Sequence, residues 1–405
     1  MNLLDIPFID DLVTIRHDLH AHPELAFKES RTSDIVAREL AAYGVEVHRG
    51  LAKTGVVGVL RKGSSLRAIG LRADMDALPL LEKNEFHHRS QHQGQMHACG
   101  HDGHTTLLLG AARYLAENID RVDFDGTVYF IFQPAEESEG GAKVMIADGL
   151  FERFPMEAVF GLHNWPGLPV GEISAMPGPV MAGTCTFEIS IHGEGCHAAM
   201  PNQGVDTLVV ASHLVLALQT IVSRNLHPCE AAAVSVTQIH GGTALNVIPD
   251  DAVLRGTIRS FTPAVESMIE RAVKRLCVGV ASTYGAQISA SFDQRYPPTV
   301  NSRAEAELCQ RTAADLVGAD QVRTTDLPST AAEDFAYMLL EKPGCYVWLG
   351  NGADSGGRSL HNPHYDFEDG SLPLGVSYWV RLVENALSEP TWQQAEGRAA
   401  RRKIQ

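Results

Sequence analysis

Short apolar runs alternate with stretches of helical periodicity along the first part of the chain. A helix is predicted at 104–118, because apolar residues recur there at the spacing of one helical face, namely Leu107, Leu108, Ala111, Ala112 and Leu115. Helices are also predicted at 10–19 and 31–43, and strands at 55–60, 68–72, 127–132 and 158–162. This alternation predicts an α/β fold with a central mixed sheet flanked by helices.

The pattern of apolar and polar residues changes near Gly183. Residues 184–191 alternate apolar and polar side chains like a half-buried strand, whereas residues 205–222 and 265–280 are helical in pattern. Further strands are predicted at 232–239, 251–258 and 287–292. The resulting order of strand, helix, two strands, helix and strand is typical of a ferredoxin-like α+β domain inserted into a larger fold.

We therefore predict two domains and a tail. The larger domain comprises residues 1–183 and 296–390, and its later part includes predicted elements at 304–316, 345–349 and 371–387. The inserted domain comprises residues 184–295. Residues 391–405 end in a polar, basic stretch and are expected to form a flexible tail.

The composition restricts the expected partners and compartment. The chain has 405 residues with 33 basic and 49 acidic side chains, a formal net charge of −16. Such a surface repels phosphate backbones and anionic membranes, so neither nucleic acid nor membrane is an expected partner. The N-terminal residues lack the pattern of a signal peptide, and no apolar run approaches the ~20 residues of a membrane span. Seven cysteines without a CxxC pair favour reduced thiols, so we expect a cytoplasmic protein.

Candidate metal ligands gather just before the helix predicted at 104–118. Cys99 and His101 are two residues apart, so one turn can direct both side chains at the same point. Thiolate and imidazole together suit Zn²⁺ and similar divalent ions. The alternative is a buried structural cysteine, and for Asp102 and His104 helix capping or support of a ligand fits equally well.

Other candidate ligands follow apolar strands elsewhere in the chain. Glu136 and Glu137 follow the strand predicted at 127–132, where one carboxylate can bind metal while the other acts as a general base. His163 follows the next apolar run, and His361 comes after the last one. A solvated acidic loop and structural histidines are the alternatives for each segment alone. Several segments that each deliver such a residue at a strand end favour a metal site.

Several motifs together resemble one family of enzymes. They are RADMDALP at 72–79, HACGHDGHT at 97–105, QPAEE at 133–137, GLHNWPG at 161–167, GGTALNVIPD at 241–250, AEDFA at 332–336 and LHNPHYDF at 360–367. The chain resembles the metal-dependent amidohydrolases that include hippurate hydrolase, bacterial N-acyl-amino-acid amidohydrolases and plant auxin-conjugate hydrolases. These form a branch of the aminoacylase and carboxypeptidase superfamily, and the likeness extends over nearly the whole chain.

The resemblance implies two divalent metal ions per subunit, with Zn, Mn, Co and Ni as candidates. The metal ligands that it implies are Cys99, His101, Glu137, His163 and His361. Glu136 would act as general base and acid. The wider superfamily usually has a histidine ligand where this chain has Asp74, and we leave Asp74 out of the predicted ligand set.

The inserted domain carries further candidates. His197 lies in a Gly-Glu-Gly-Cys-His segment that resembles the lid motif of the family, whose histidine helps to hold the substrate and its oxyanion. Asn246 and Arg259 are candidate substrate contacts, although Asn246 also fits a simple turn. The resemblance further implies a homodimer or higher homo-oligomer through this lid. His87, His88 and His92 are expected to form a solvated loop.

The predicted function is hydrolysis of the amide bond of N-acyl-L-amino acids, small molecules of the hippurate or N-acetyl type, by a metal-activated water. Glu136 would accept the proton of that water and pass it to the leaving amine. One alternative is an aminopeptidase or dipeptidase of the same superfamily. Another is a metal-binding protein without catalytic activity. The presence of both Glu136 and Glu137 argues against this alternative.

Overall fold

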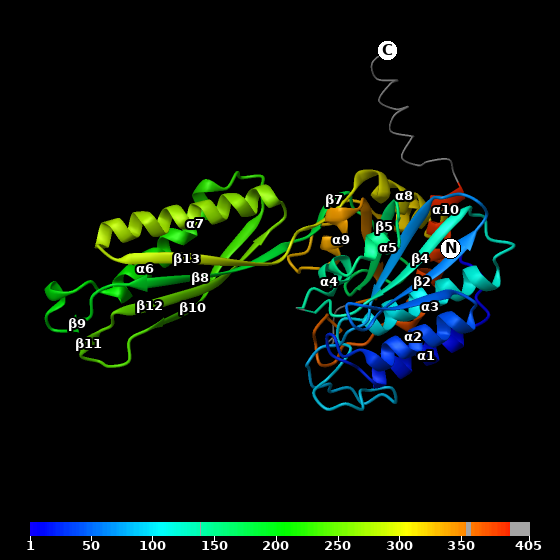
Figure 1. Cartoon of the computed structure of the whole chain (residues 1–405), viewed down its shortest axis with the longest axis horizontal. Coiled ribbons are helices and arrows are strands. Elements are labelled where there is room, and N and C mark those ends of the chain that lie inside the picture. The colour runs from blue at the N-terminus through cyan, green and yellow to red at the C-terminus, as the bar shows by residue number, and fades with distance from the viewer. Residues whose placement is uncertain (138, 354–357, 389–405) are drawn as a thin grey trace, which may run out of the picture. The chain divides into compact units, whose positions relative to one another are not determined.

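The computed structural model describes residues 1–137, 139–353 and 358–388. The chain forms two compact units, drawn in Figure 1. The first comprises Met1–Gly178, Val300–Leu327 and the described residues from Asp334 onward, and the second comprises Pro179–Thr299 and Pro328–Glu333. The second unit thus begins and ends a few residues outside the predicted insert and also takes in a short later segment. The predicted tail at 391–405 lies outside the described residues.

The first unit contains a mixed eight-stranded sheet. Its central strands β4, β3, β5 and β16 run parallel, while β1 and β2 extend one edge in antiparallel pairing. At the other edge, β6 pairs antiparallel with β16 and parallel with β15. In spatial order the strands are β1 (Glu46–Leu51), β2 (Gly55–Lys62), β4 (Gly126–Gln133), β3 (Ala68–Asp74), β5 (Ala158–Trp165), β16 (Gly344–Gly350), β6 (Ile173–Ser174) and β15 (Val322–Arg323).

Every residue of β4 and β16 is buried, because helices cover the centre of the sheet. Such strands appear in the sequence as continuous apolar runs rather than as an alternating pattern. One group of mutually packed helices contains α1 (Ile9–Ala21), α2 (Ser30–Ala42), α3 (His101–Glu117), α8 (Arg303–Val317) and α10 (Leu372–Ser388). A second group contains α4 (Gly141–Ala147), α5 (Leu150–Arg153) and α9 (Phe335–Glu341). The predicted α/β class with a flanked mixed sheet is confirmed.

The second unit has the predicted element order. Its elements are β8 (Gly183–His192), α6 (Thr207–Thr220), β10 (Ala232–Gly241), β12 (Asp251–Ser260), α7 (Pro263–Tyr284) and β13 (Gln287–Tyr296). The four strands form an antiparallel sheet in the order β10-β12-β8-β13. Buried and partly exposed residues alternate along β8, and its buried side chains join those of α6 and α7 in one core. The alternation of apolar and polar residues predicted for this strand therefore arises because α6 and α7 cover only one face of the sheet.

Short strands add a second ladder to this unit. β9 (Cys196–His197) pairs with β11 (Val247–Ile248), which brings together two segments that the sequence analysis treated separately. Helix α6 begins where the Asp206 carboxylate accepts hydrogen bonds from the amides of Leu208 and Val209. Two further short strands, β7 (Gly178–Met181) and β14 (Thr299–Asn301), lie where the chain leaves one unit and enters the other.

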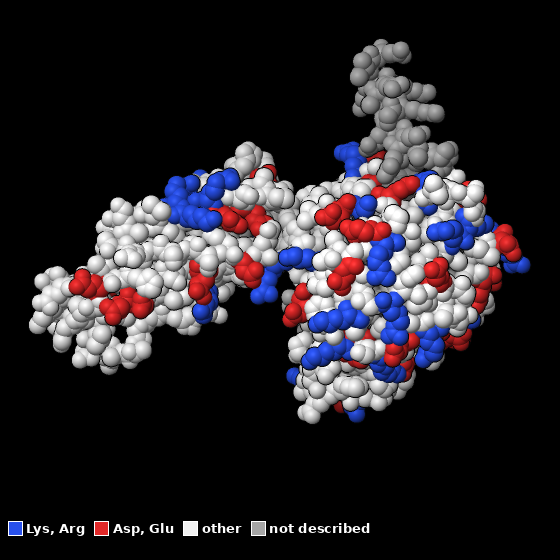
Figure 2. Space-filling view, viewed as in Figure 1, with Lys and Arg blue, Asp and Glu red and all other residues white. Residues whose placement is uncertain are grey.

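One described helical segment, Thr207–Asn225, is long and apolar enough by composition to cross a membrane. Its buried residues Val210, Leu214 and Leu218 belong to the core of the second unit, which accounts for part of its apolar character. The face in Figure 2 shows acidic and basic side chains interspersed over the first unit, whereas much of the second unit carries neither. Local charge on this face is therefore mixed despite the net charge of −16.

Candidate metal centre

The candidate ligands meet at the carboxyl ends of parallel strands in the first unit. Strand β5 carries His163, β4 is followed by Glu136 and Glu137, and α3 begins at His101. Parallel strands place their carboxyl ends at one edge of the sheet, which is where open α/β sheets bind ligands. Their alignment thus brings together residues that lie far apart in the sequence.

All five predicted metal ligands belong to overlapping groups whose donor atoms lie within 4.8 Å of one another. One group contains Cys99, His101 and His163, and another contains Cys99, Glu137 and His361. A third joins His101 to Glu136 and Glu137. The shared members Cys99, His101 and Glu137 connect these groups into one cluster, as a centre with two neighbouring ions requires.

The donor set fits a metal centre because several of its lone pairs are not used by the protein. Both ring nitrogens of His101 are buried and make no hydrogen bond with any described residue, although Nδ1 lies 3.4 Å from an Asp76 oxygen. His163 donates from Nδ1 to the carbonyl of Asn164 at 2.6 Å, so its Nε2 is left facing the Cys99 sulfur at 3.4 Å. Buried polar groups are rarely left unpaired, so the two nitrogens of His101 fit a cation ligand.

The charge of the pocket favours a cation. Burial and the carboxylates of Glu137 and Glu136 hold the pKa of the Cys99 thiol well above its usual range. Burial opposes the protonated form of His101, but Asp74 and Asp76 outweigh it and raise its pKa to about 10. The carboxylates thus create a negative field in which protons take the place of metal ions, and divalent ions would convert the thiol to a ligating thiolate.

Asp76 holds Glu136 and Glu137 in place through their backbone. Its two carboxylate oxygens accept hydrogen bonds from the amides of Glu136 and Glu137, each at 2.9 Å. The preceding residue, Ala135, has a left-handed φ of 58°, and its amide donates to the buried Glu29 carboxylate at 2.9 Å. Two buried carboxylates therefore hold this loop in a conformation that its own residues disfavour.

Asp74 and His104 support the cluster, whereas the sequence left their roles open. His104 uses Nδ1 to contact Asp74 at 2.6 Å and Nε2 to contact the Asn164 side chain at 2.7 Å, so neither nitrogen is left for a metal. Asp74 also accepts a hydrogen bond from Arg72 at 2.7 Å and lies 3.8 Å from Nε2 of His101. Its oxygens are therefore already occupied by protein donors.

Sequence reasoning missed several buried polar residues around this site. Asp334 of the Ala-Glu-Asp-Phe-Ala motif accepts hydrogen bonds from Arg72, Gln133 and the amide of Ala142. Its position in that motif was the available signal, but it was used only for the family resemblance. Ala142 lies in the first turn of α4, shortly after Glu136 and Glu137. Through Ala142, Arg72 and Gln133, Asp334 therefore connects the end of this loop to strands β3 and β4.

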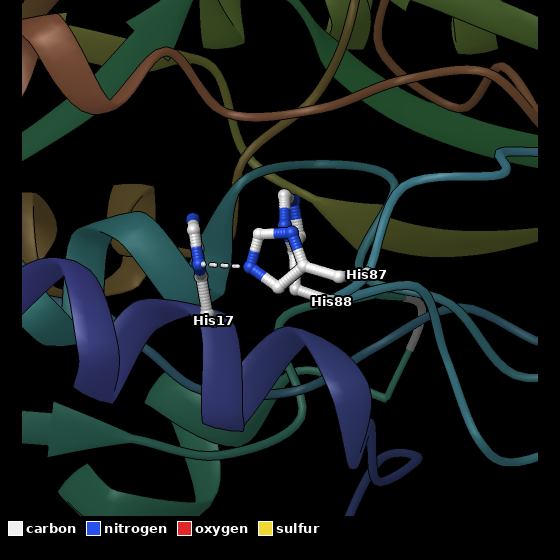
Figure 3. Close-up of side chains that lie close together, drawn as sticks. All are labelled: His17, His87 and His88. Carbon is white, nitrogen blue, oxygen red and sulfur yellow. Dashed lines mark hydrogen bonds between the residues drawn. The ribbon is translucent and has the colours of Figure 1, made fainter.

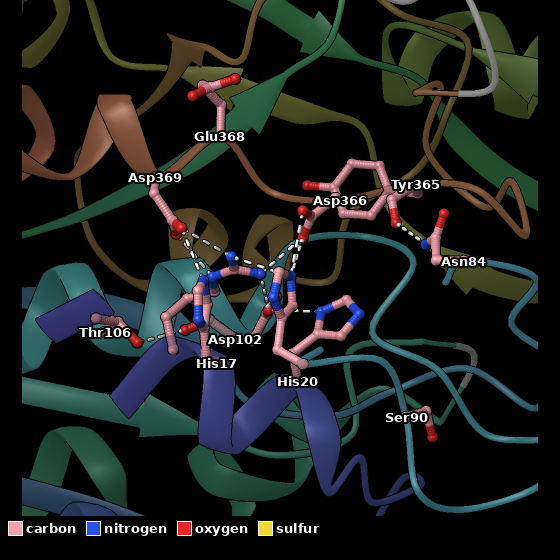
Figure 4. A network of polar contacts seen from close by, with 12 residues as sticks. His17, His20, Asn84, Ser90, Asp102, Thr106, Tyr365, Asp366, Glu368 and Asp369 are labelled. Atoms are coloured by element: carbon pink, nitrogen blue, oxygen red, sulfur yellow. Dashed lines mark hydrogen bonds and ion pairs between the residues drawn. The ribbon is translucent and has the colours of Figure 1, made fainter. Parts of the chain in front are cut away.

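A second missed network centres on Arg16, which is fully buried. Its guanidinium contacts Asp366 at 2.7 Å and Asp369 at 2.8 Å. Figure 4 labels these two aspartates together with Asp102 and His20. Asp102 lies between this arginine and His20, which it contacts at 2.9 Å. Asp102 is thus bonded to α1 and does not point away as a solvated helix cap.

The remaining predicted site residues lie in the second unit. His197 is exposed on β9, and its Nδ1 accepts a hydrogen bond from the amide of Ala199 at 3.0 Å. Asn246 is exposed just before β11, the strand that pairs with β9. Arg259 lies half-buried on β12, where burial lowers the pKa of its guanidinium. His197 therefore lies on this small ladder, and Asn246 lies beside it, where its carbonyl accepts a hydrogen bond from the amide of Ala198 at 3.0 Å.

Comparisons with known proteins agree with this geometry. The model of peptidase family M20/M25/M40 matches residues 70–385. The hippurate hydrolase of Campylobacter jejuni is 40% identical over 95% of this chain and 99% of that protein. The IAA-amino acid hydrolase ILR1-like 4 of Arabidopsis thaliana is 37% identical over 94% of this chain and 87% of that protein. The crystal structure of a dinuclear metal-binding M20 peptidase from Bacillus subtilis superposes with a TM-score of 0.83 at 33% identity, covering 95% and 99% of the two chains.

Proposed function

Because the chain belongs to peptidase family M20/M25/M40, we propose that it is a metal-dependent amidohydrolase that cleaves N-acyl-L-amino acids into a carboxylic acid and a free amino acid. The observation that carries the proposal is the position of Glu136, a buried carboxylate whose donor atom lies within 4.8 Å of those of His101 and Glu137. A base placed beside the ligand set is what hydrolysis by an activated water requires.

The ligands proposed are Cys99, His101, Glu137, His163 and His361. When bound, two divalent ions act as Lewis acids that polarise water and the amide carbonyl. Glu136 accepts the proton of the attacking water on its carboxylate and later gives it to the leaving nitrogen. The amide of Asp334 lies 3.3 Å from Oε1 of Glu136 and limits the rotation of that carboxylate. Asp76 holds the backbone of the same loop, so the base keeps its position while the proton moves.

The test is Glu136→Gln, which keeps the size of the side chain and removes the base. We expect unchanged metal content and a fall in kcat of ~10²–10⁴-fold, the usual contribution of general acid–base catalysis. Glu139→Gln is the matched control, because Glu139 is an exposed acidic residue of the same loop. A Glu136→Gln enzyme that retains both metal and near-normal turnover would contradict the role of this residue.

A substrate panel separates acylase from peptidase activity. Hippurate, acetyl, longer acyl and indole-acetyl amino acids are compared with free dipeptides, each with Zn²⁺, Mn²⁺, Co²⁺ or Ni²⁺. The names of the relatives lead us to expect higher kcat/KM on the acylated compounds. Preference for free dipeptides would replace the proposal with an aminopeptidase or dipeptidase.

We further propose that His197, Asn246 and Arg259 contact the substrate. A histidine donor suits the developing oxyanion, and an arginine suits the amino-acid carboxylate through paired hydrogen bonds. On this basis Arg259→Lys should raise KM with little change in kcat, whereas His197→Ala should lower kcat. The matched control is His192→Ala, an exposed histidine of the same unit. Equal effects of the two histidine substitutions would remove His197 from the proposal.

We propose that the protein is a cytoplasmic homo-oligomer that associates through the second unit. All seven cysteines are free. Strand β10 is an edge strand of its sheet and exposes Ile239 by 57%, and α6 exposes Leu216 by 69%. Unpaired edges and exposed apolar side chains favour association. Ile239→Glu should lower the mass measured by light scattering, whereas Leu66→Glu in the first unit should not. A wild-type monomer would exclude this arrangement.

A further inference from the structure

Three histidines lie together outside the cluster around Cys99. His17 lies on α1, whereas His87 and His88 belong to the segment between β3 and α3, and Figure 3 shows the three side chains converging. The sequence predicts a solvated loop for His87, His88 and His92. That expectation is wrong for His88, which is only 8% exposed, because α1 packs over it and its ring stacks on that of His17.

The spacing of the ring nitrogens suits one shared ion. One nitrogen from each histidine lies within 4.8 Å of one nitrogen from each of the others. Nε2 of His87 and Nδ1 of His17 are 3.2 Å apart. Two nitrogens that each lie ~2.0–2.1 Å from a tetrahedral ion are separated by ~3.3 Å, so this pair needs almost no movement to bind one.

Carboxylates orient two of the three rings in the manner typical of metal-bound histidines. Nε2 of His17 contacts Asp369 at 2.8 Å, and Nε2 of His88 contacts Asp366 at 3.2 Å. A ring that donates its Nε2 hydrogen to a carboxylate presents the lone pair of Nδ1. Nδ1 of His88 is buried and makes no hydrogen bond with the described residues, while its Nε2 also lies 3.4 Å from the Arg16 guanidinium. The His88 ring stacks on that of His17 at an angle of 13°, so binding both to one ion requires one of the two rings to rotate.

The local charge permits a cation and keeps His17 neutral. Burial and Arg16 lower the pKa of His17, so its imidazole is unprotonated at neutral pH. The positive charge of Arg16 is itself offset, since its guanidinium contacts both Asp366 and Asp369. His17 is partly exposed and His87 is exposed, which gives an ion a path from solvent.

We propose that His17, His87 and His88 form an additional metal site that binds one borderline divalent ion such as Zn²⁺ or Cu²⁺. Imidazole is the preferred ligand of such ions, and three histidines leave one position for water. The bound ion replaces the hydrogen that His87 and His17 share and joins α1 to the segment that precedes Cys99. Its role is structural, because the three residues carry no part of the proposed hydrolysis.

The test compares His87→Gln with His92→Gln. Both residues are exposed histidines of the same loop, but His92 is not a member of the group. Each protein is dialysed with excess Zn²⁺ and then against metal-free buffer, and its metal content is measured per chain. We expect the wild type and His92→Gln each to retain one more equivalent of Zn²⁺ than His87→Gln. Added Zn²⁺ should also raise the unfolding temperature of the wild type and of His92→Gln more than that of His87→Gln.

A spectroscopic measurement gives an independent reading. Cu²⁺ added to the Zn²⁺-loaded enzyme should show electron paramagnetic resonance couplings to nitrogen that disappear in His87→Gln and in His17→Gln. The glutamine amide can take the place of Nε2 and still donate to Asp369, whereas the ligand position of Nδ1 is lost. Equal metal content in wild type and His87→Gln, or an equal loss in His92→Gln, would overturn the proposal. Neither outcome depends on which substrate the enzyme hydrolyses.

Discussion

Replacing Asp74 by asparagine removes one negative charge from a fully buried cluster while keeping the shape of the side chain. Asp74 accepts hydrogen bonds from Arg72 at 2.7 Å and from His104 at 2.6 Å. Burial opposes its ionisation, but the charges of His101 and Arg72 outweigh that effect and hold the pKa of Asp74 well below its usual range. The wild-type side chain is therefore a carboxylate at neutral pH.

The cost of this substitution can be estimated from the two contacts. An asparagine oxygen can accept from only one of the two donors, and its amide group then faces the other, which leaves a buried donor unpaired. The substitution breaks the buried ion pair of Arg72 with Asp74, while the second ion pair of Arg72, with Asp334 at 2.9 Å, remains. Breaking a buried pair costs ~3–5 kcal/mol, which corresponds to a fall of roughly 6–20 °C in the unfolding temperature of a unit of this size.

The assay pairs thermal unfolding with metal analysis. If Asp74 only orients its neighbours, Asp74→Asn should be destabilised by ~3–5 kcal/mol both with and without metal, and it should still bind both ions at saturation. Asp148→Asn serves as a control carboxylate of the first unit, because Asp148 is exposed and its side chain accepts a hydrogen bond from the backbone amide of Ala52. Loss of one ion with unchanged stability of the metal-free protein would show instead that Asp74 is a ligand.

Three further predictions concern residues around the same centre. Cys99→Ser should lower the bound metal, measured per chain by mass spectrometry, because a hydroxyl does not ionise as a thiol does; unchanged content would exclude the thiolate. Gly100→Ala should destabilise the fold by ~2–5 kcal/mol in thermal unfolding, because Gly100 has φ of 93° and an added methyl group would meet Asn164. Gly94→Ala, which meets no neighbour within 4 Å, should cost less. Burial opposes protonation of His20, but Asp102 and Glu82 raise its pKa to about 9, above the usual 6.5. The contribution of protonated His20 to the free energy of unfolding is complete below pH 6.5 and disappears as the pH rises through 9. Urea unfolding of the wild type should therefore show a loss of up to ~3 kcal/mol in the free energy of unfolding over this range, and His20→Gln should not show it.

The sequence predicted the elements whose side chains repeat with a clear period. The buried strands β4 and β16 and helix α3 fall within a few residues of their predicted bounds, because burial imposes apolar residues on them. The edge strand β1 was missed because its residues are mostly polar and exposed. Short elements such as β6 and α9 were also missed, since two or seven residues are too few to show a period.

The candidate ligands were predictable because each follows an apolar strand or precedes a helix, whereas their supporting residues were not. Arg16 is separated from Asp369 by 353 positions, and nothing in the local pattern around either residue indicates that they meet. His88 likewise reads as polar loop sequence until α1 is placed over it. Contacts between distant segments depend on how the helices dock on the sheet, which local periodicity does not encode.

His101 and His104 illustrate the division between the two kinds of information. The sequence by itself determined the chemistry that is available, a thiol, imidazoles and carboxylates at the ends of buried strands. Both histidines belong to one motif at the start of α3, and either could serve as a ligand. Only the tertiary structure distinguishes them, because Asp74 and Asn164, which lie 30 and 60 positions from His104, occupy its two nitrogens. The nitrogens of His101 make no hydrogen bond within the part of the chain that the structure describes. Metal binding requires a free lone pair, and whether one remains free depends on the partners that the fold supplies.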